Sequence, residues 1–252
     1  MSAAGFAGAD KITIYFYSSE TNINNFKSLK MEFDIYLAKF GHYELQPFSD
    51  REAFEEHIRD KKKCLLLLSS WHYSSIYKRY CLNPVLVGMR NGKKYQKRIL
   101  VTRDKSANLE IGEVGQIASA SSVQHTFSVL NGMLKGKNAA DKVRILTVPK
   151  DIDALMSVGF GISKSALTTR NSLNKLELVN PILYKKMEIL AEGKQALLLI
   201  LAVPKNFTKD AEKMVDIIKN MSANPDGKRK IQMLGLDGWQ KLDPADRSTL
   251  ES

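Results

Sequence analysis

The stretch Gln116-Ile-Ala-Ser-Ala-Ser-Ser-Val-Gln-His-Thr-Phe-Ser-Val-Leu-Asn-Gly-Met-Leu134 combines an apolar strand pattern, a serine-rich turn and an amphipathic helix pattern in direct succession. The free backbone N–H groups at the start of such a helix, together with the helix dipole, favour an anion. Ser119, Ser121, Ser122 and Thr126 would surround that anion with hydroxyl groups. The alternative is that Ser121 or Ser122 only caps the helix, as serine often does.

The alternation of strand and helix continues on both sides of this stretch. Residues 11–17 alternate like a strand, and residues 25–40 place their apolar side chains on one helical face. Further strands are predicted at residues 43–48, 64–69, 99–102, 143–148, 164–168 and 197–203, further helices at residues 152–158 and ending at Gly235, and a turn at Asn91-Gly92. Strands that alternate with helices predict an α/β fold of mainly parallel sheets flanked by helices.

Ligands of parallel sheets bind outside the carboxyl ends of the strands. We therefore predict the ligand-binding residues from the expected strand ends, which are rich in hydroxyl groups. They are Ser18, Ser19 and Glu20; Ser70, Trp71, His72 and Tyr73; Ser119, Ser121, Ser122 and the nearby His125; and Thr168, Thr169 and Arg170. Trp71 and Tyr73 could wall an organic ligand, and His72 or Arg170 could contact an acidic group. Taken singly, Trp71 reads equally well as a core residue and Arg170 as part of a solvated face.

The composition is that of an ordinary globular protein. With 44% hydrophobic and 26% charged residues, a chain of 252 residues can form one large domain or two lobes. The net charge of +11 is spread over the chain without a basic tail, so we predict no nucleic-acid partner. The longest apolar run, residues 196–203, is too short for a membrane helix.

Residues 3–9 are small and apolar and resemble the end of a secretory signal. They predict a periplasmic or otherwise extracytoplasmic protein whose signal peptide has been removed; the alternative is an N-terminus without such meaning. Cys64 and Cys81 could form a disulfide in an oxidising compartment, but the sequence does not supply the geometry. The histidines never fall at metal-ligand spacing, and we expect neither a metal nor a cofactor.

Several segments resemble one family. Leu109-Glu-Ile-Gly-Glu-Val-Gly-Gln-Ile-Ala118 is similar to the start of the second lobe in the type 2 periplasmic solute-binding proteins, in the phosphate/phosphite/phosphonate-binding branch of ABC transporter substrate-binding proteins. Residues 151–161 and 164–169 look like the helix and strand that follow in that lobe. Residues 187–191, 221–227 and 234–239 are similar to the family's return to the first lobe. The resemblance covers most of residues 11–242.

The resemblance implies a two-lobed fold with lobe 1 at residues 1–94 and 178–252 and an inserted lobe 2 at residues 95–177. Two crossover hinges, near residues 91–97 and 170–181, would let the lobes close around a small oxyanionic ligand in the interlobe cleft. The implied partner is an ABC permease, and the implied state is a monomer. The sequence leaves the ligand's identity and the oligomeric state open.

The ligand loop departs from the family pattern. Phosphonate binders carry Ser-Thr-Ser-Gly where this chain has Ser119-Ala-Ser-Ser122, and no acidic residue follows the strand end at Thr168-Thr169 to meet an ammonium group. The resemblance therefore favours an uncompensated anion or an uncharged polar solute over an aminophosphonate.

Two other functions are compatible with the sequence. A receptor of the same fold could present its ligand to a signalling partner, and a neighbouring permease gene would argue against it. A hydrolase could use His125 as base and Ser122 as nucleophile, but no carboxylate is evident to orient the histidine.

Overall fold

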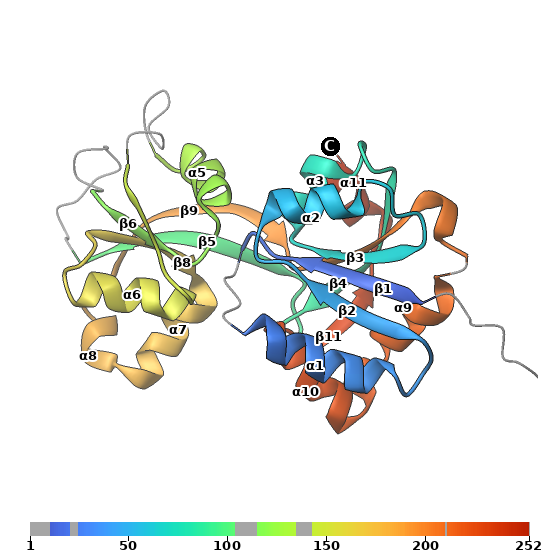
Figure 1. Ribbon diagram of the computed structural model, residues 1–252. Helices are drawn as coiled ribbons and strands as arrows, with labels where there is room; N and C mark the ends of the chain where they lie inside the picture. Colours follow the sequence, from blue (N-terminus) through green and yellow to red (C-terminus); the bar gives the residue numbers. More distant parts are fainter. Residues whose placement is uncertain (1–10, 21–24, 104–114, 135–142, 210, 252) are drawn as a thin grey trace, which may run out of the picture. The chain divides into compact units, whose positions relative to one another are not determined.

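The computed structural model describes residues 11–20, 25–103, 115–134, 143–209 and 211–251 (Figure 1). The chain divides into two compact units, each built around its own sheet. The first unit comprises Met1–Tyr17, Asn25–Lys94 and Leu197–Ser252, and the second comprises Ser18–Asn24 and Tyr95–Ala196.

The sheet of the first unit has the strand order β11-β4-β10-β3-β1-β2. Its strands are β1 (Ile12–Tyr17), β2 (Tyr43–Pro47), β3 (Cys64–Leu68), β4 (Leu82–Met89), β10 (Ile200–Pro204) and β11 (Gly238–Lys241). β1 pairs with β2 and β3 in parallel, whereas β10 pairs with β3 and β4 in antiparallel. Every residue of β3 and β10 is buried, as the apolar runs in their sequences predict.

The helices of the first unit each bury part of their surface. They are α1 (Phe26–Leu37), α2 (Arg51–Ile58), α3 (Ser70–Ile76), α9 (Glu212–Lys219), α10 (Pro225–Met233) and α11 (Pro244–Glu251). α1 buries Leu29, Phe33 and Leu37, as their helical spacing predicts. Cys64 is buried and Cys81 is exposed, and the two are free cysteines.

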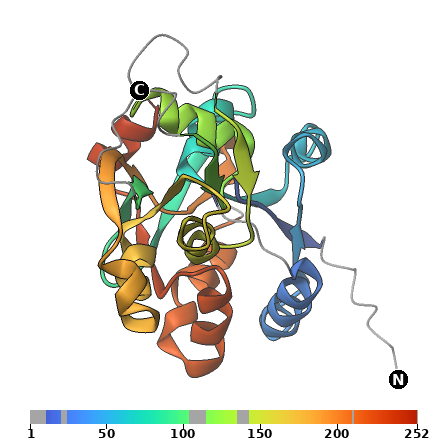
Figure 2. The ribbon, with the colours of Figure 1, turned by 90° about the vertical axis from the view of Figure 1, so that its left-hand side faces the viewer.

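The sheet of the second unit has the order β7-β6-β8-β5-β9, seen from a second side in Figure 2. Its strands are β5 (Tyr95–Thr102), β6 (Ile117–Ser119), β7 (Ile145–Thr147), β8 (Ser165–Thr169) and β9 (Glu188–Leu197); its helices are α5 (Val123–Asn131), α6 (Asp151–Gly159), α7 (Arg170–Val179) and α8 (Pro181–Tyr184). β6 runs parallel to β7 and β8, and β5 runs antiparallel to β8.

Helices cover both faces of this second sheet. Along β5, Ile99 and Val101 pack with the buried residues of α6, α7 and α8, whereas Leu100 packs with Leu130 of α5. Figure 1 shows α5 on one face of the sheet and the other three helices on the opposite face. The alternation of a strand's side chains thus places the start of α5 and the start of α6 at the same sheet edge but on opposite faces.

The same order of strands occurs in both sheets. In the first sheet the parallel strands follow the order β2-β1-β3, and the antiparallel β10 comes next. In the second sheet the parallel strands follow the order β7-β6-β8, and the antiparallel β5 comes next. This order confirms the predicted two-lobed, type 2 periplasmic-binding-protein fold. The predicted turn is also confirmed: Asn91 and Gly92 adopt φ of 51° and 69° between β4 and β5.

The division of the chain differs from the expected lobes at two places. The change after residue 94 coincides with the expected one, but the chain returns to the first unit at Leu197 and not at residue 178. The reason is that Leu183 of α8 joins the second unit's core and β9 pairs with β5. In addition, residues 18–20 group with the second unit although β1 and α1, on either side of them, belong to the first.

Candidate functional site

The candidate site lies at the edge of the second sheet where the parallel strands β6, β7 and β8 end. β5 begins at this edge because it runs antiparallel to β8, with Arg98 opposite Thr169. Residues 18–20 contact the same edge through hydrogen bonds to Ser121, Ser122 and Arg98. The edge therefore gathers side chains from five separate segments.

The serine-rich turn is almost completely buried. The hydroxyl oxygens of Ser119 and Thr126 lie 2.9 Å apart, and the backbone N–H of Ser121 donates to Ser119 Oγ over 3.2 Å. Ser122 Oγ accepts a hydrogen bond from the backbone N–H of His125 at 3.3 Å. Ser122 thus caps α5, as one of the two serines was expected to do.

Two backbone carbonyl groups of the chain itself lie at the start of α5. The backbone N–H of Ser122 donates to Ser19 O at 2.8 Å, and Ser121 Oγ donates to Glu20 O at 3.3 Å. Ser19 and Glu20 are both buried. The first turn of α5 therefore already attracts electronegative atoms, as a helix N-terminus does.

Arg98 is the charged centre of the site. Its guanidinium donates to Asp151 Oδ1 and to Glu20 O, both at 2.6 Å, and lies 3.9 Å from the Glu20 carboxylate. The Gln96 amide also donates to that carboxylate. Only 5% of Arg98 is exposed, and a buried guanidinium is stable only with such partners.

His125 is a neutral side chain in this environment. Burial, and then the positive charge of Arg98, lower the pKa of His125 to about 3. An imidazole with that pKa is a weak base at neutral pH. The hydrogen bond that joins His125 to Ser122 comes from its backbone N–H, which gives no support to a base and nucleophile pair.

The end of β8 contains further hydroxyl groups. Thr168 Oγ1 donates to Asp151 O at 3.1 Å, and Thr169 Oγ1 accepts from the backbone N–H of Ser172, which caps α7. Arg170 points away from this cluster: it is exposed and forms an ion pair with Glu192.

The expected shortage of carboxylates near Thr168 does not hold in three dimensions. Asp151 follows β7 and Glu20 follows β1, and both side chains reach the edge where β8 ends. The sequence concealed this because the two residues lie far from residue 168 along the chain.

The residues predicted after β3 serve mainly the structure of the first unit. Ser70 Oγ donates to Leu197 O at 2.7 Å, and Arg51 lies 5.2 Å from the ring of the half-buried Trp71. His72 and Tyr73 have no exposed surface, which favours neither the expected contact of His72 with an acidic group nor the expected contact of Tyr73 with an organic ligand. His72 Nε2 lies 3.0 Å from Glu55 Oε1, and burial lowers the pKa of His72 to about 4 although this contact acts the other way.

The sequence reasoning missed two residues of the site, Arg98 and Asp151. Asp151 could have been found, because it closely follows a predicted strand parallel to β6. Arg98 could not, because its importance depends on the antiparallel register that places it opposite Thr169. Among the described residues no group of histidine, cysteine or carboxylate side chains has the arrangement of a metal site. Nor does any helix in the described ranges have the length and apolar character needed to cross a membrane.

The strand order of the two sheets defines the class of this protein as a type 2 solute-binding protein. Residues 41–247 match the family of ABC transporter, phosphonate, periplasmic substrate-binding proteins, and the chain belongs to this family. The family assignment confirms the resemblance found in the sequence. A search of curated proteins gives no match.

Solved structures share the fold at low sequence identity. XAC2383 from Xanthomonas citri bound to ATP is 11% identical with a TM-score of 0.71, over 96% of this chain and 95% of that chain. A binding protein component of an ABC phosphonate transporter from Pseudomonas aeruginosa is 14% identical with a TM-score of 0.65, over 96% and 86%. PhnD1 from Prochlorococcus marinus in complex with methylphosphonate is 12% identical with a TM-score of 0.64, over 96% of both chains.

Proposed function

We propose that this protein is the extracytoplasmic receptor of an ABC transporter and binds a small phosphorus oxyanion at the start of α5. The observation that carries the proposal is the family match over residues 41–247, together with the buried hydroxyl cluster at that helix start. A permease is the expected partner, because the family consists of the substrate-binding proteins of ABC transporters. The protein acts by binding and carries out no catalysis.

The charges of the site narrow the proposed ligand. Asp151 and Glu20 outweigh the single charge of Arg98, so the site has no surplus of positive side-chain charge to offer. An oxyanion would instead be held by hydroxyl groups and by backbone N–H groups at the helix start. One carboxylate charge is left over after pairing with Arg98 and suits an ammonium group, so the candidate ligands include aminophosphonates alongside simple phosphonates.

A thermal-shift panel tests the ligand class. We would measure the melting temperature of ligand-free protein with phosphate, phosphite, methylphosphonate, 2-aminoethylphosphonate, sulfate, acetate and glucose. A ligand at about 100 times its Kd stabilises the native state by about 2.7 kcal/mol, which is a rise of several degrees. We expect that rise with at least one phosphorus oxyanion. A rise with glucose alone would refute the oxyanion assignment.

The Ser121→Ala variant tests the location of the site. We expect at least a tenfold weaker affinity for the ligand found in the panel, because one hydrogen-bonding group of the cluster is lost. Ser74→Ala is a matched control, since the Ser74 hydroxyl also donates to a backbone carbonyl, that of Leu250, in the first unit. Equal affinities of the two variants, measured by isothermal titration calorimetry, would place the ligand elsewhere.

A further inference from the structure

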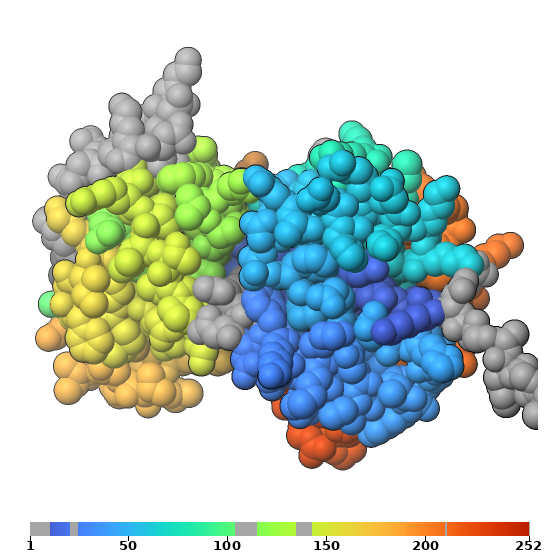
Figure 3. Space-filling model, viewed as in Figure 1, coloured from blue at the N-terminus to red at the C-terminus, as the bar shows by residue number. Residues whose placement is uncertain are grey.

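An exposed apolar surface lies on the second unit, away from the residues of the proposed site. Five large apolar side chains at the ends of α6 and α7 and on α8 are exposed, and we call them the α6–α8 patch: Phe160 (72% exposed), Ile162 (59%), Leu178 (84%), Val179 (71%) and Ile182 (73%). The space-filling view shows the yellow-to-orange segment that includes α6 and α8 at the surface of this unit (Figure 3). Monomeric proteins seldom expose several large apolar side chains together without a purpose.

The helices that carry the patch pack tightly against one another. A Cβ atom on Gly159 would lie 2.6 Å from the side chain of Leu183, so the end of α6 packs directly against α8. Asn180, between α7 and α8, caps α8 by accepting from the backbone N–H of Leu183 at 3.0 Å. The patch residues therefore project from a fixed corner where three helices meet, and Val158, Leu176 and Leu183 are buried beneath it in one core cluster.

Basic side chains border the patch. Lys175 lies three and four residues before Leu178 and Val179 on α7, so helical spacing puts it on the same side as these apolar neighbours, and the exposed Lys185 and Lys186 directly follow α8, which carries Ile182. Arg103 donates to Gly159 O at 2.6 Å, next to Phe160. Glu177, also exposed, adds one acidic side chain on α7. In the described ranges, Lys175, Lys185 and Lys186 form no ion pair, so their charges are available to an outside partner.

We propose that the α6–α8 patch binds the surface of an anionic phospholipid membrane. Its apolar side chains would enter the boundary between headgroups and acyl chains, and its basic border would contact the phosphates. The same border argues against a second copy of this chain, because a two-fold interface would bring like charges together. Membrane binding would hold the receptor close to the membrane in which a permease resides, and it is independent of the ligand site.

Vesicle co-sedimentation tests the proposal. We expect the protein to bind vesicles of phosphatidylcholine with about 30% phosphatidylglycerol at least tenfold more strongly than vesicles of phosphatidylcholine alone, and to lose affinity as salt rises. Absence of binding to the anionic vesicles would overturn the proposal.

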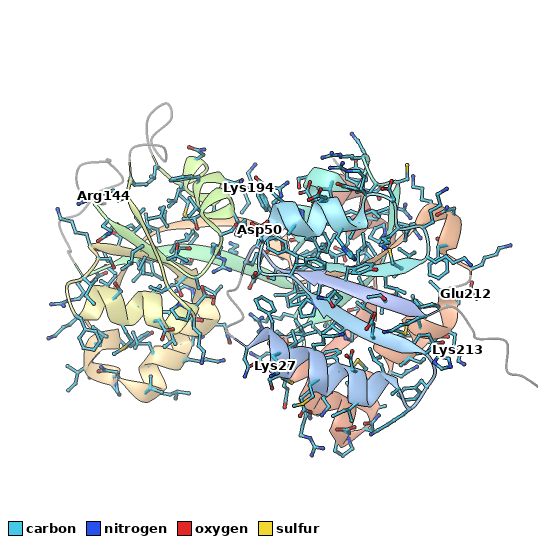
Figure 4. The ribbon with its side chains drawn as sticks, in the orientation of Figure 1. Lys27, Asp50, Arg144, Lys194, Glu212 and Lys213 are labelled. Atoms are coloured by element: carbon cyan, nitrogen blue, oxygen red, sulfur yellow. The ribbon has the colours of Figure 1, made fainter. Side chains whose placement is uncertain are left out.

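Two pairs of variants connect the binding to the patch. Phe160→Ser/Leu178→Ser/Ile182→Ser should weaken binding at least tenfold, whereas Met31→Ser/Ile35→Ser, which removes exposed apolar side chains of α1, should leave it unchanged. Lys185→Glu/Lys186→Glu should weaken it more than Lys27→Glu/Lys213→Glu, which makes the same change in net charge on the first unit (Figure 4). If the patch variant and its control lost the same vesicle affinity in either pair, the binding would depend on general charge or hydrophobicity and not on the patch.

Two further measurements separate membrane binding from self-association and from ligand binding. Analytical ultracentrifugation without vesicles would reveal a dimer that the triple Ser variant abolishes, and that result would assign the patch to a second copy of the chain. The thermal-shift panel, repeated on the triple variant, should give unchanged ligand responses. Failure of vesicle binding with normal ligand responses would thus leave the proposed function intact.

Discussion

Arg98 shows how one charged side chain can join distant segments. It contacts Glu20 and Asp151, which lie 78 and 53 residues away in the chain. It carries its charge into a region where only 5% of the residue remains exposed. Removing it would leave two carboxylates in that region without their counter-charge.

The Arg98→Met variant should therefore lower the free energy of unfolding by about 3 kcal/mol, as expected when one partner of a buried ion pair is removed. Urea denaturation followed by circular dichroism would measure the change. Arg170→Met is the control, because Arg170 pairs with Glu192 on the exposed surface, and we expect its midpoint to stay close to that of the wild type. Similar losses in both variants would show that Arg98 is no more important than a surface residue.

His125 makes stability depend on pH. Its folded-state pKa of about 3 lies below the ordinary value of 6.5, so the unfolded chain binds a proton first as the pH falls. Its contribution is fully present above pH 6.5 and is lost as the pH falls from there toward 3. At about pH 4.5 the loss amounts to about 3 kcal/mol.

Calorimetry between about pH 7 and pH 4.5 would measure this dependence, and the His125→Gln variant should flatten it relative to the wild type. His72, whose pKa is lowered to about 4, adds a dependence of the same sign, which the His125 variant retains. An unchanged pH profile in His125→Gln would contradict the buried, neutral histidine.

At the level of single residues, the sequence predicted local hydrogen bonding better than the direction in which a side chain points. It limited the cap of α5 to Ser121 or Ser122, because capping depends on local sequence, and the structure shows Ser122 at the cap. It could not tell that Tyr73 faces the core, because the partner of the Tyr73 hydroxyl is Glu251, 178 residues away. A strand-end rule gives the position of a residue but not the direction of its side chain.

The start of α5 allows capping and ligand binding to be separated. Ser122→Ala should destabilise the protein by about 1 kcal/mol through loss of the cap. Asn25→Ala removes the equivalent cap of α1 and should cost a similar amount. If Ser122 also contacts the ligand, only Ser122→Ala will weaken phosphonate binding in titration calorimetry. Equal binding by the two variants would leave Ser122 with a capping role alone.

Helix α10 contains a glycine that tolerates no side chain. A Cβ atom on Gly227 would lie 2.2 Å from the backbone oxygen of Met221, which cannot move without its neighbours. We expect Gly227→Ala to lower the free energy of unfolding by roughly 2–3 kcal/mol.

Gly132→Ala is the matched control for this change. The nearest atom to its new Cβ would be 3.5 Å away, and its φ of −85° suits alanine, so stability should stay equal or rise slightly. Denaturant titration of both variants would check the contrast, and equal stabilities would contradict the close approach at Gly227.

Elements with strong periodicity could be predicted from the sequence, whereas the strands β4, β9 and β11 were not, and β9 and β4 show the physical reason. β9 lies at the edge of its sheet and has mostly half-buried or exposed residues, so it lacks an apolar pattern. β4 contains Pro84, which argues against a central strand, and the structure accommodates it beside a register shift in β10. In both strands, the partners determine the structure more than the local sequence does.

At the scale of the whole molecule, the family resemblance predicted the two-lobed fold, and the order of strands in each sheet confirmed it. Local patterns alone could not have predicted that residues 18–20 group with the second unit, because this grouping depends on Arg98 and on the start of α5. The return of the chain to the first unit at Leu197 could not be predicted either, because β9 has no apolar pattern in its sequence and belongs to the second sheet only through its pairing with β5.

The position of β10 in the first sheet has a consequence for biosynthesis. β10 lies between β3 and β4, yet it is made more than one hundred residues after them, whereas β5 to β9 of the second sheet come from one continuous stretch. As the chain leaves the ribosome, the strands of the second sheet can pair while the first sheet still has an open gap at its centre. Until β10 is made, one edge of the apolar strand β3 has no pairing partner. Slowing synthesis before residue 200 should therefore favour aggregation of the nascent chain.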